Sequence, residues 1–178
     1  MTILITIMAS TAHAQIDNGD FEDGLGLWVP LADDYYLADR RSGGNPGYHA
    51  YMQSHPIWPG SATWHQTFDC GEEDPTGVSL CFITFDYYLH NLGDYSETAM
   101  FTVEVDHELV YSSPLGAQWI DWTTISLEVP CGRHLIVFKH STSSGGNSWA
   151  AGFDNVSAEC LDSTAADTSD WGRVKILY

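Results

Sequence analysis

Gly152–Cys160 reads Gly-Phe-Asp-Asn-Val-Ser-Ala-Glu-Cys, and this stretch defines the fold class that we expect. Its apolar residues alternate from Phe153 to Ala158, which is typical of a short β-strand, and it ends on a cysteine. A polar segment follows, so the strand is expected to close a domain. Near the other end, Asn18–Glu22 reads Asn-Gly-Asp-Phe-Glu, a short strand with carboxylates beside one aromatic residue. We expect these two ends to meet.

Composition indicates one packed domain and narrows the possible partners. The chain has 178 residues, of which 44% are hydrophobic and 13% aromatic. This is enough for one core plus short terminal extensions. Lys and Arg total 6 against 24 Asp and Glu, a formal charge of -18, so the phosphate backbone of a nucleic acid would be repelled. Calcium, neutral sugars and cationic surfaces remain possible partners, although acidity also serves solubility alone.

The first residues resemble an export signal. Ile3–Met8 is an apolar run that is too short to span a bilayer, and Ala12-His13-Ala14 fits the small-x-small cleavage rule. We therefore predict a signal peptide over residues 1–14, a mature start at Gln15 and a protein that is secreted, extracellular or at the cell surface. No transmembrane segment is expected.

Between residues 15 and 160 the chain alternates short apolar runs with Gly, Pro, Asn and Asp. About ten strands at this spacing predict an all-β sandwich. Val78–Leu89 carries apolar residues on both faces, which indicates a central strand, and Arg41–Tyr48 is expected to be a loop. The expected strands are Asp17–Glu22, Tyr35–Ala38, Tyr48–Gln53, Thr63–Phe68, Val78–Leu89, Thr98–Val105, Glu108–Tyr111, Thr123–Val129, His134–His140 and Trp149–Cys160. Residues 161–178 form an acidic linker and a short hydrophobic tail, Trp171–Tyr178.

Four cysteines predict two disulfides in an exported chain: Cys70, Cys81, Cys131 and Cys160. Cys70 and Cys81 flank one turn between strands. A hairpin joining His134–His140 to Trp149–Cys160 would bring Cys131 near Cys160. We therefore favour the pairs 70–81 and 131–160, with the other two pairings left open.

The order of several motifs resembles bacterial carbohydrate-binding modules of the galactose-binding-like jelly-roll type. These motifs are Asn18-Gly-Asp-Phe-Glu22 with Trp28, Leu80-Cys-Phe-Ile-Thr-Phe-Asp-Tyr-Tyr88, Phe101–Val110, Trp122–Leu127 and Phe153-Asp-Asn-Val-Ser157. The resemblance covers roughly residues 17–160 and implies a jelly-roll sandwich of two antiparallel sheets. The extracellular MAM domain, another jelly roll, is similar in some of the same stretches and is the second choice.

This resemblance also implies a structural calcium ion where the first and last strands meet. By position, Glu22 and Asp154 would offer side chains, Asp20 its backbone carbonyl, and residues 45–48 further carbonyls. Carboxylates combined with carbonyls suit calcium, which takes about six to eight oxygen ligands. Alternatively, Glu22 and Asp154 are ordinary acids at the edges of strands.

Sugar binding needs flat aromatic faces that stack on pyranose rings, with amides that bond hydroxyl groups. Because loops or turn edges flank them, the candidates are Tyr35, Tyr36, Trp58, Tyr95, Trp119 and Trp122, with Asn91 and Gln118 as polar contacts. Most aromatics of a sandwich are core, as we expect for Trp28, Trp64, Phe82, Phe85, Phe101 and Phe153. The pattern does not select the binding face.

Together these features predict a secreted, non-catalytic, calcium-stabilised module that binds poly- or oligosaccharides. The alternative is a cell-surface structural or adhesion protein attached or sorted through its C-terminal tail. A third is a small polysaccharide-acting enzyme, for which no Gly-x-Ser-x-Gly, His-Glu-x-x-His or phosphate-loop motif is present, so no catalytic residue is assigned.

Overall fold

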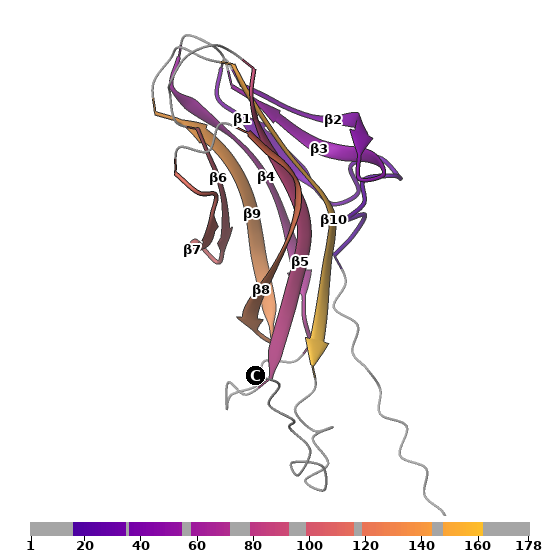
Figure 1. The fold of residues 1–178 in the computed structure, drawn as a ribbon. Helices are drawn as coiled ribbons and strands as arrows, with labels where there is room; N and C mark the ends of the chain where they lie inside the picture. Colours follow the sequence, from indigo (N-terminus) through magenta and orange to yellow (C-terminus); the bar gives the residue numbers. More distant parts are fainter. Residues whose placement is uncertain are drawn as a thin grey trace, which may run out of the picture.

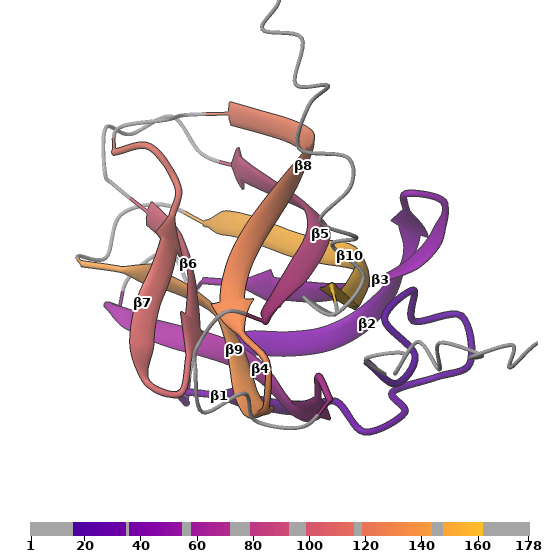
Figure 2. The same cartoon turned by 90° about the horizontal axis from the view of Figure 1, so that it is seen from below.

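Ten β-strands make up the regular structure of the computed structural model, which describes residues 16–34, 36–54, 58–71, 79–92, 99–115, 119–143 and 148–161. Sheet A consists, in spatial order, of β1 (Val29–Ala32), β4 (Gly60–Asp69), β9 (Arg133–Thr142), β6 (Ala99–Val105) and β7 (Glu108–Ser112). Sheet B consists of β2 (Leu37–Gly44), β3 (Gly47–Gln53), β10 (Trp149–Leu161), β5 (Leu80–Asn91) and β8 (Trp119–Pro130). Every pair is antiparallel. The predicted all-β sandwich is confirmed, and Figures 1 and 2 show its two layers.

Alternation along β5 separates the core from the outer face of sheet B. Ile83, Phe85 and Leu89 are fully buried between the sheets. Asp86 and Tyr88 have the opposite parity and lie on the outer face. The predicted alternation is therefore correct, but Phe82 shares the outer face and is only half-buried, whereas we expected it in the core.

Aromatic rings join the two sheets at the centre of the core. Phe138 of sheet A stacks on Phe153 of sheet B, with centroids 3.9 Å apart and planes 15° apart. Phe21, from the segment before β1, packs edge-on against Phe153 at 5.4 Å. The Val156 amide donates a hydrogen bond to the Gly19 carbonyl at 2.9 Å. The two ends of the domain therefore meet, as the sequence predicts.

The segment Asp17–Glu22 is not a strand, which corrects our expectation. It forms turns, with positive φ angles of 47° at Asn18 and 55° at Phe21. The Asn18 side chain closes these turns, because its Nδ2 donates to the Gly24 carbonyl at 2.9 Å and its Oδ1 accepts from the Asp23 amide at 3.1 Å. Local side-chain hydrogen bonds thus replace a strand ladder here.

Two predicted connections also differ from the structure. The stretch expected as a loop, Arg41–Tyr48, is largely strand, because β2 extends to Gly44 and β3 begins at Gly47. Strands β9 and β10 do not form a hairpin, since they belong to different sheets. A sequence pattern marks each strand but not the sheet it joins.

The Cys70–Cys81 disulfide is present as predicted, with an S–S distance of 2.07 Å. Cys70 follows β4 of sheet A and Cys81 lies in β5 of sheet B, so the bond links the two layers. Cys131 is buried, and the side chain of Cys160 lies outside the described residues, so the second pairing stays a prediction. The signal peptide and the tail also lie outside them. Within the described residues, no helix has the length and hydropathy needed to cross a bilayer.

Candidate functional site

Six aromatic side chains gather on the outer face of sheet B, and we call them the aromatic patch. They come from β3, β5 and β8 and are His49, Tyr51, Tyr88, His90, Trp119 and Trp122. The strand register brings them together, because Tyr51 and Tyr88 both pair with Gly152 of the intervening strand β10. Paired residues on neighbouring strands point to the same face, and a register shift in β8 between Ile120 and Thr123 brings both Trp119 and Trp122 to that face.

A glycine in the middle strand makes room for the patch. A Cβ atom on Gly152 would lie only 2.7 Å from the imidazole Cδ2 of His49, so a larger residue would push the rings apart. Above it, Trp122 packs edge-on against Tyr88 at 4.7 Å and against His49 at 5.5 Å. The rings line a depression of about 360 Å³, bounded also by Arg41 and Leu92.

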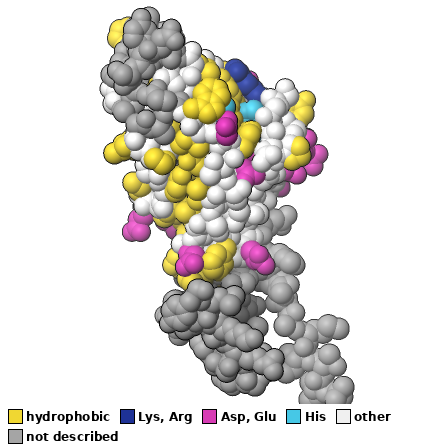
Figure 3. Space-filling view, viewed as in Figure 1, with side chains coloured by type: hydrophobic (Ala, Val, Ile, Leu, Met, Phe, Trp, Pro, Cys, Tyr) yellow, Lys and Arg dark blue, Asp and Glu magenta, His cyan; other side chains and the backbone are white. Residues whose placement is uncertain are grey.

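Trp119 provides the flat exposed surface of the patch. Its ring is stacked on His90, with centroids 3.7 Å apart and planes 7° apart, yet 57% of the residue remains exposed. Its Nε1 donates to Asp121 at 2.8 Å, which fixes the ring orientation. In Figure 3, hydrophobic, histidine and Lys or Arg side chains lie next to one another near the top of the face shown. An exposed, fixed aromatic plate is the feature that sugar stacking requires.

Polar atoms of the patch are neutral at physiological pH. Burial lowers the pKa of His49 to about 4, and burial raises the pKa of Tyr88 well above its usual value. The His49 Nε2 and the Tyr88 hydroxyl form a hydrogen bond of 3.1 Å. Neutral donors and acceptors beside apolar rings suit sugar hydroxyl groups.

The predicted ligand-binding residues are dispersed over the molecule. Trp119 and Trp122 belong to the patch, and half-buried Asn91 ends the same strand as Tyr88. Trp58 is 51% exposed but lines a different hollow, with Asp33 and Asp34. Tyr35, Tyr95 and Gln118 lie outside the described residues.

Tyr36 does not present its ring for stacking, contrary to our expectation. It is 9% exposed, packs within the core cluster and shares a short hydrogen bond with the Thr142 hydroxyl. The residue directly precedes β2 and turns inward, so that its ring lies near Gly60 of β4 and His140 of β9.

Four patch residues were missed from the sequence: His49, Tyr51, Tyr88 and His90. Tyr88 follows Tyr87 in an apolar run and resembles a core residue by composition. The available signal was parity: Asp86 and His90 lie on the same face as Tyr88, and an acid and a histidine on one face mark it as the outer one.

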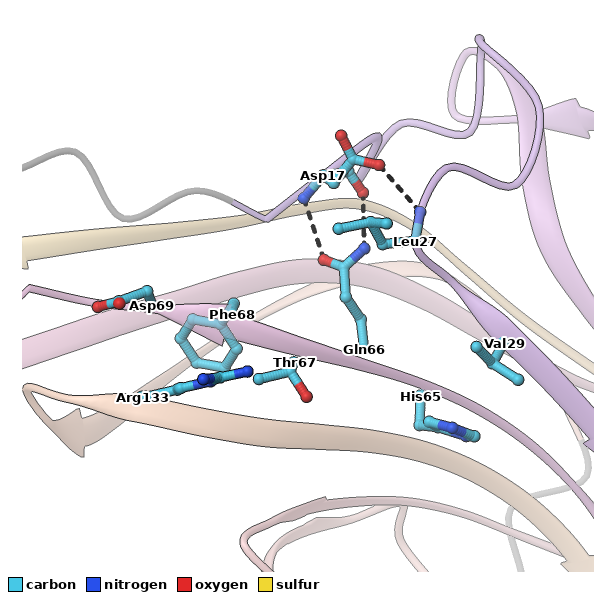
Figure 4. Close-up of a pocket in the computed structure, with 9 residues that line it drawn as sticks. All are labelled: Asp17, Leu27, Val29, His65, Gln66, Thr67, Phe68, Asp69 and Arg133. Atoms are coloured by element: carbon cyan, nitrogen blue, oxygen red, sulfur yellow. Dashed lines mark hydrogen bonds between the residues drawn. The ribbon is translucent and has the colours of Figure 1, made fainter.

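A larger hollow, of about 660 Å³, lies on sheet A and suits a sugar less well. Figure 4 shows its lining: Asp17, Leu27, Val29, His65, Gln66, Thr67, Phe68, Asp69 and Arg133. Asp17 and Gln66 satisfy each other through two hydrogen bonds of 3.0 Å. Phe68 is its only Phe, Tyr or Trp and is 2% exposed, so the hollow offers no ring face for stacking.

Three carboxylates lie beside the patch, near the turn of the β2–β3 hairpin: Glu22, Asp86 and Asp154. Asp154 is fully buried, and its Oδ2 accepts from the Asn45 amide at 2.7 Å. Glu22 accepts from the Tyr48 amide at 2.6 Å, so the two acids hold opposite ends of the hairpin turn. Burial, supported by the charges of Asp86 and Glu22, raises the pKa of Asp154 to about 6.

Carboxylate and backbone carbonyl oxygens, the ligand types that calcium prefers, both lie beside the hairpin turn. Among the described residues, no three His, Cys, Asp or Glu side chains are grouped to hold a metal. A calcium ion would therefore need backbone oxygens as well. One backbone oxygen, the Tyr48 carbonyl, lies near the Asp154 carboxylate. These two oxygens are 2.5 and 2.6 Å from the position that a Cβ on Gly44 would fill. Asp20 is exposed, and its side chain accepts from the Glu22 amide at 3.3 Å.

Comparison with known proteins places the fold. No protein-family model and no curated protein sequence matches the chain. Among solved structures, one from a study of the promiscuous specificity of carbohydrate-binding modules of the β-sandwich superfamily matches at 14% identity. The match covers 85% of this chain and 64% of that chain, with a TM-score of 0.54. TmCBM61 in complex with β-1,4-galactotriose matches at 13% identity, over 80% and 95%, with a TM-score of 0.52.

The K3 adhesin domain of Lys-gingipain from Porphyromonas gingivalis matches at 12% identity, over 82% of this chain and 99% of that chain, with a TM-score of 0.59. The chain spans 64%, less than two thirds, of the length of the first matched structure. The chain has the β-sandwich fold that carbohydrate-binding modules and adhesin domains of this kind adopt.

Proposed function

We propose that the protein is a non-catalytic carbohydrate-binding module that binds poly- or oligosaccharides through the aromatic patch. The observation that carries this proposal is the exposed Trp119 plate beside the depression lined by Trp122, Tyr88 and His49. The ring faces would stack on pyranose rings, and the neutral polar atoms would bond hydroxyl groups. The fold shared with carbohydrate-binding modules supports the same conclusion.

Calorimetry and affinity electrophoresis against a glycan panel test this proposal. Wild-type protein should bind a polysaccharide, and Trp119→Ala and Trp122→Ala should each weaken binding about tenfold or more, or about 1.4 kcal/mol. Trp58→Ala is the matched control, since it removes a Trp about as exposed as Trp119 from a different hollow. Loss of binding in that control alone would move the site to Trp58. Release of reducing sugar would favour the enzyme instead.

We also propose a structural calcium ion held by Glu22, Asp154 and the carbonyls of Asp20 and residues 45–48. The supporting observation is the position of Asp154, where burial, together with the nearby charges of Asp86 and Glu22, disfavours the ionised carboxylate. A divalent cation would offset this cost. It would stabilise the contact between the N-terminal turns, the hairpin and β10, and would not touch the sugar.

Thermal unfolding tests the calcium proposal. Saturating calcium should raise the Tm by about 5–10 °C relative to excess chelator. Asp154→Asn should remove this difference, and Asp23→Asn, an exposed acid outside the cluster, should keep it. Without calcium, the raised pKa of Asp154 makes wild-type stability fall as pH rises from about 4 to about 6, and Asp154→Asn should lose that slope. Equal Tm values with calcium and chelator would contradict the proposal.

A second candidate function is adhesion, with the protein acting as a secreted or cell-surface subunit. The fold match to an adhesin domain favours it, as do exposed Val29 and Leu31 of the edge strand β1 and exposed Leu27 just before it. The Cys70–Cys81 disulfide supports an oxidising, extracellular location for either function. No detectable binding to any glycan of the panel, together with self-association in size-exclusion chromatography, would favour adhesion.

A further inference from the structure

Arg41 lies at one side of the aromatic patch and lines the same depression as Trp122 and Tyr88. It pairs in register with His49, across strands β2 and β3. The chain has only 6 Lys and Arg residues against 24 Asp and Glu, so a cation in the candidate binding site is an exception to its composition.

The neighbouring arginine shows how different the environment of Arg41 is. Arg40 points to the opposite face, where its Nε donates to the Phe21 carbonyl at 2.5 Å and its Nη2 to the Glu22 carbonyl at 2.9 Å. The guanidinium of Arg41 instead stacks on the Tyr51 ring, 3.7 Å from its centroid. Arg40 holds the N-terminal turns in place, whereas Arg41 faces the depression.

No carboxylate neutralises Arg41 within the described part of the chain. The ion pairs between described side chains join His90 to Asp121 and His134 to Asp106, and neither involves an arginine. Stacking on Tyr51 uses the flat face of the guanidinium and leaves N–H groups at its edge. That edge matches a planar anion, which it can bind through two parallel hydrogen bonds.

A buried polar atom lies next to this cation. His49 is 4% exposed, and its Nδ1 has no hydrogen-bond partner among the described residues, although it lines the depression. A buried polar atom without a partner is costly unless a ligand or water bonds it. Arg41 and this buried imidazole therefore lie together at one side of the depression, where the guanidinium supplies the charge.

Acidic residues around the patch define where an anion fits. Asp121 lies at the far side, bonded to the Trp119 indole at 2.8 Å. Asp86 accepts from Thr124 at 2.5 Å and from Asn155 at 2.9 Å, and Asp154 is held by backbone amides. An anionic group is thus favoured beside Arg41 and disfavoured beside Trp119.

We propose that the patch prefers sugars with an anionic group, a uronate carboxylate or a sulfate ester, which Arg41 binds while neighbouring rings stack on Trp122 and Trp119. This inference rests on the proposed function, because it assigns a ligand class to the same site. The uronate and the sulfate share the chemistry that a guanidinium recognises, and separate ligands distinguish them.

Matched ligand pairs test the preference by calorimetry at about 0.15 M salt, where the Debye length is about 8 Å and remote acids are screened. One pair is a galacturonate oligosaccharide and its methyl ester, and the other is a sulfated and an unsulfated galactan oligosaccharide. Wild-type protein should bind one acidic member at least about tenfold more tightly than its neutral counterpart. Arg41→Gln should weaken the acidic member far more than the neutral one, so that the two bind about equally, and Arg41→Lys should keep part of the preference.

Arg133→Gln is the control, because Arg133 is exposed on sheet A, far from the patch on sheet B. Removing this positive charge should leave the preference intact. Equal or tighter binding of the neutral members would overturn this inference and leave the proposed function standing. An acidic preference that survives Arg41→Gln would overturn the role of Arg41. Absence of binding to any member and to the wider panel would overturn both proposals. Tm measurements check that each variant is folded.

Discussion

His140 is a polar residue placed inside the core. It lies in β9, is fully buried and packs 6.4 Å from the Tyr36 ring. Neither ring nitrogen has a hydrogen-bond partner among the described residues. Burial lowers its pKa to about 4, so the imidazole is neutral in the folded protein. In the unfolded chain the same group is protonated below about pH 6.5.

Replacing His140 by leucine should therefore flatten the acid side of the stability profile. Because the unfolded state binds the additional proton, wild-type stability falls as pH drops from about 6.5 to about 4. His140→Leu should lose this component, on the order of 2–3 kcal/mol between pH 7 and pH 4. Urea unfolding of both proteins across that range measures the difference. Parallel profiles for the two proteins would contradict the assignment, and His49→Gln controls for the other buried histidine with a lowered pKa.

For single residues, the sequence predicted which chemical groups lie near one another better than it predicted which side chains are exposed. Asp154 and Glu22 lie where the two ends meet and hold the same hairpin turn, and their role as calcium ligands stays a prediction. Tyr36 and Trp119 were selected for the same reason, a flanking loop, yet one is 9% and the other 57% exposed. Exposure depends on what packs over a residue from distant strands, which local pattern does not contain.

At the scale of elements, the link between β4 and β5 carries the disulfide that joins the two sheets. Cys70 and Cys81 are separated by 11 positions and are fully buried. Closing a loop of this length restricts the unfolded chain and stabilises the fold by about 3 kcal/mol in the loop-entropy treatment.

The double variant Cys70→Ala/Cys81→Ala should lower the free energy of unfolding by about that amount. Urea denaturation of oxidised wild type and variant gives the difference. A reductant should shift the wild-type midpoint toward that of the variant and leave the variant itself nearly unchanged. An unaltered midpoint in the variant would show that the bond adds nothing to stability.

Strand pairing was harder to predict than strand position. Nine of the expected strands overlap observed ones, because period-two alternation is a local property. The exception, Asp17–Glu22, has the composition of a strand but is closed into turns by Asn18. The β9–β10 hairpin failed for another reason: consecutive strands of a sandwich can cross from one sheet to the other, and nothing in either strand encodes that choice.

For the whole molecule, the resemblance to jelly-roll modules predicted the architecture but not the location of the aromatic patch. The fold class follows from strand number and spacing, which many sequences share. The patch depends on the register of β3, β10, β5 and β8 around Gly152, a relation that becomes visible only when these strands lie side by side. Function resides in such a surface, and the fold supports it without specifying the ligand.

The position of β10 also governs when the protein can fold. This last strand lies in the middle of sheet B, between β3 and β5, where it makes ladders with both. During synthesis, β2 and β3 have no partner within the rest of that sheet until residues 149–161 are available. Pairing over such sequence separations is slow to form. Sheet B therefore cannot be completed until nearly the whole domain has been synthesised. This order is compatible with transport across a membrane before folding.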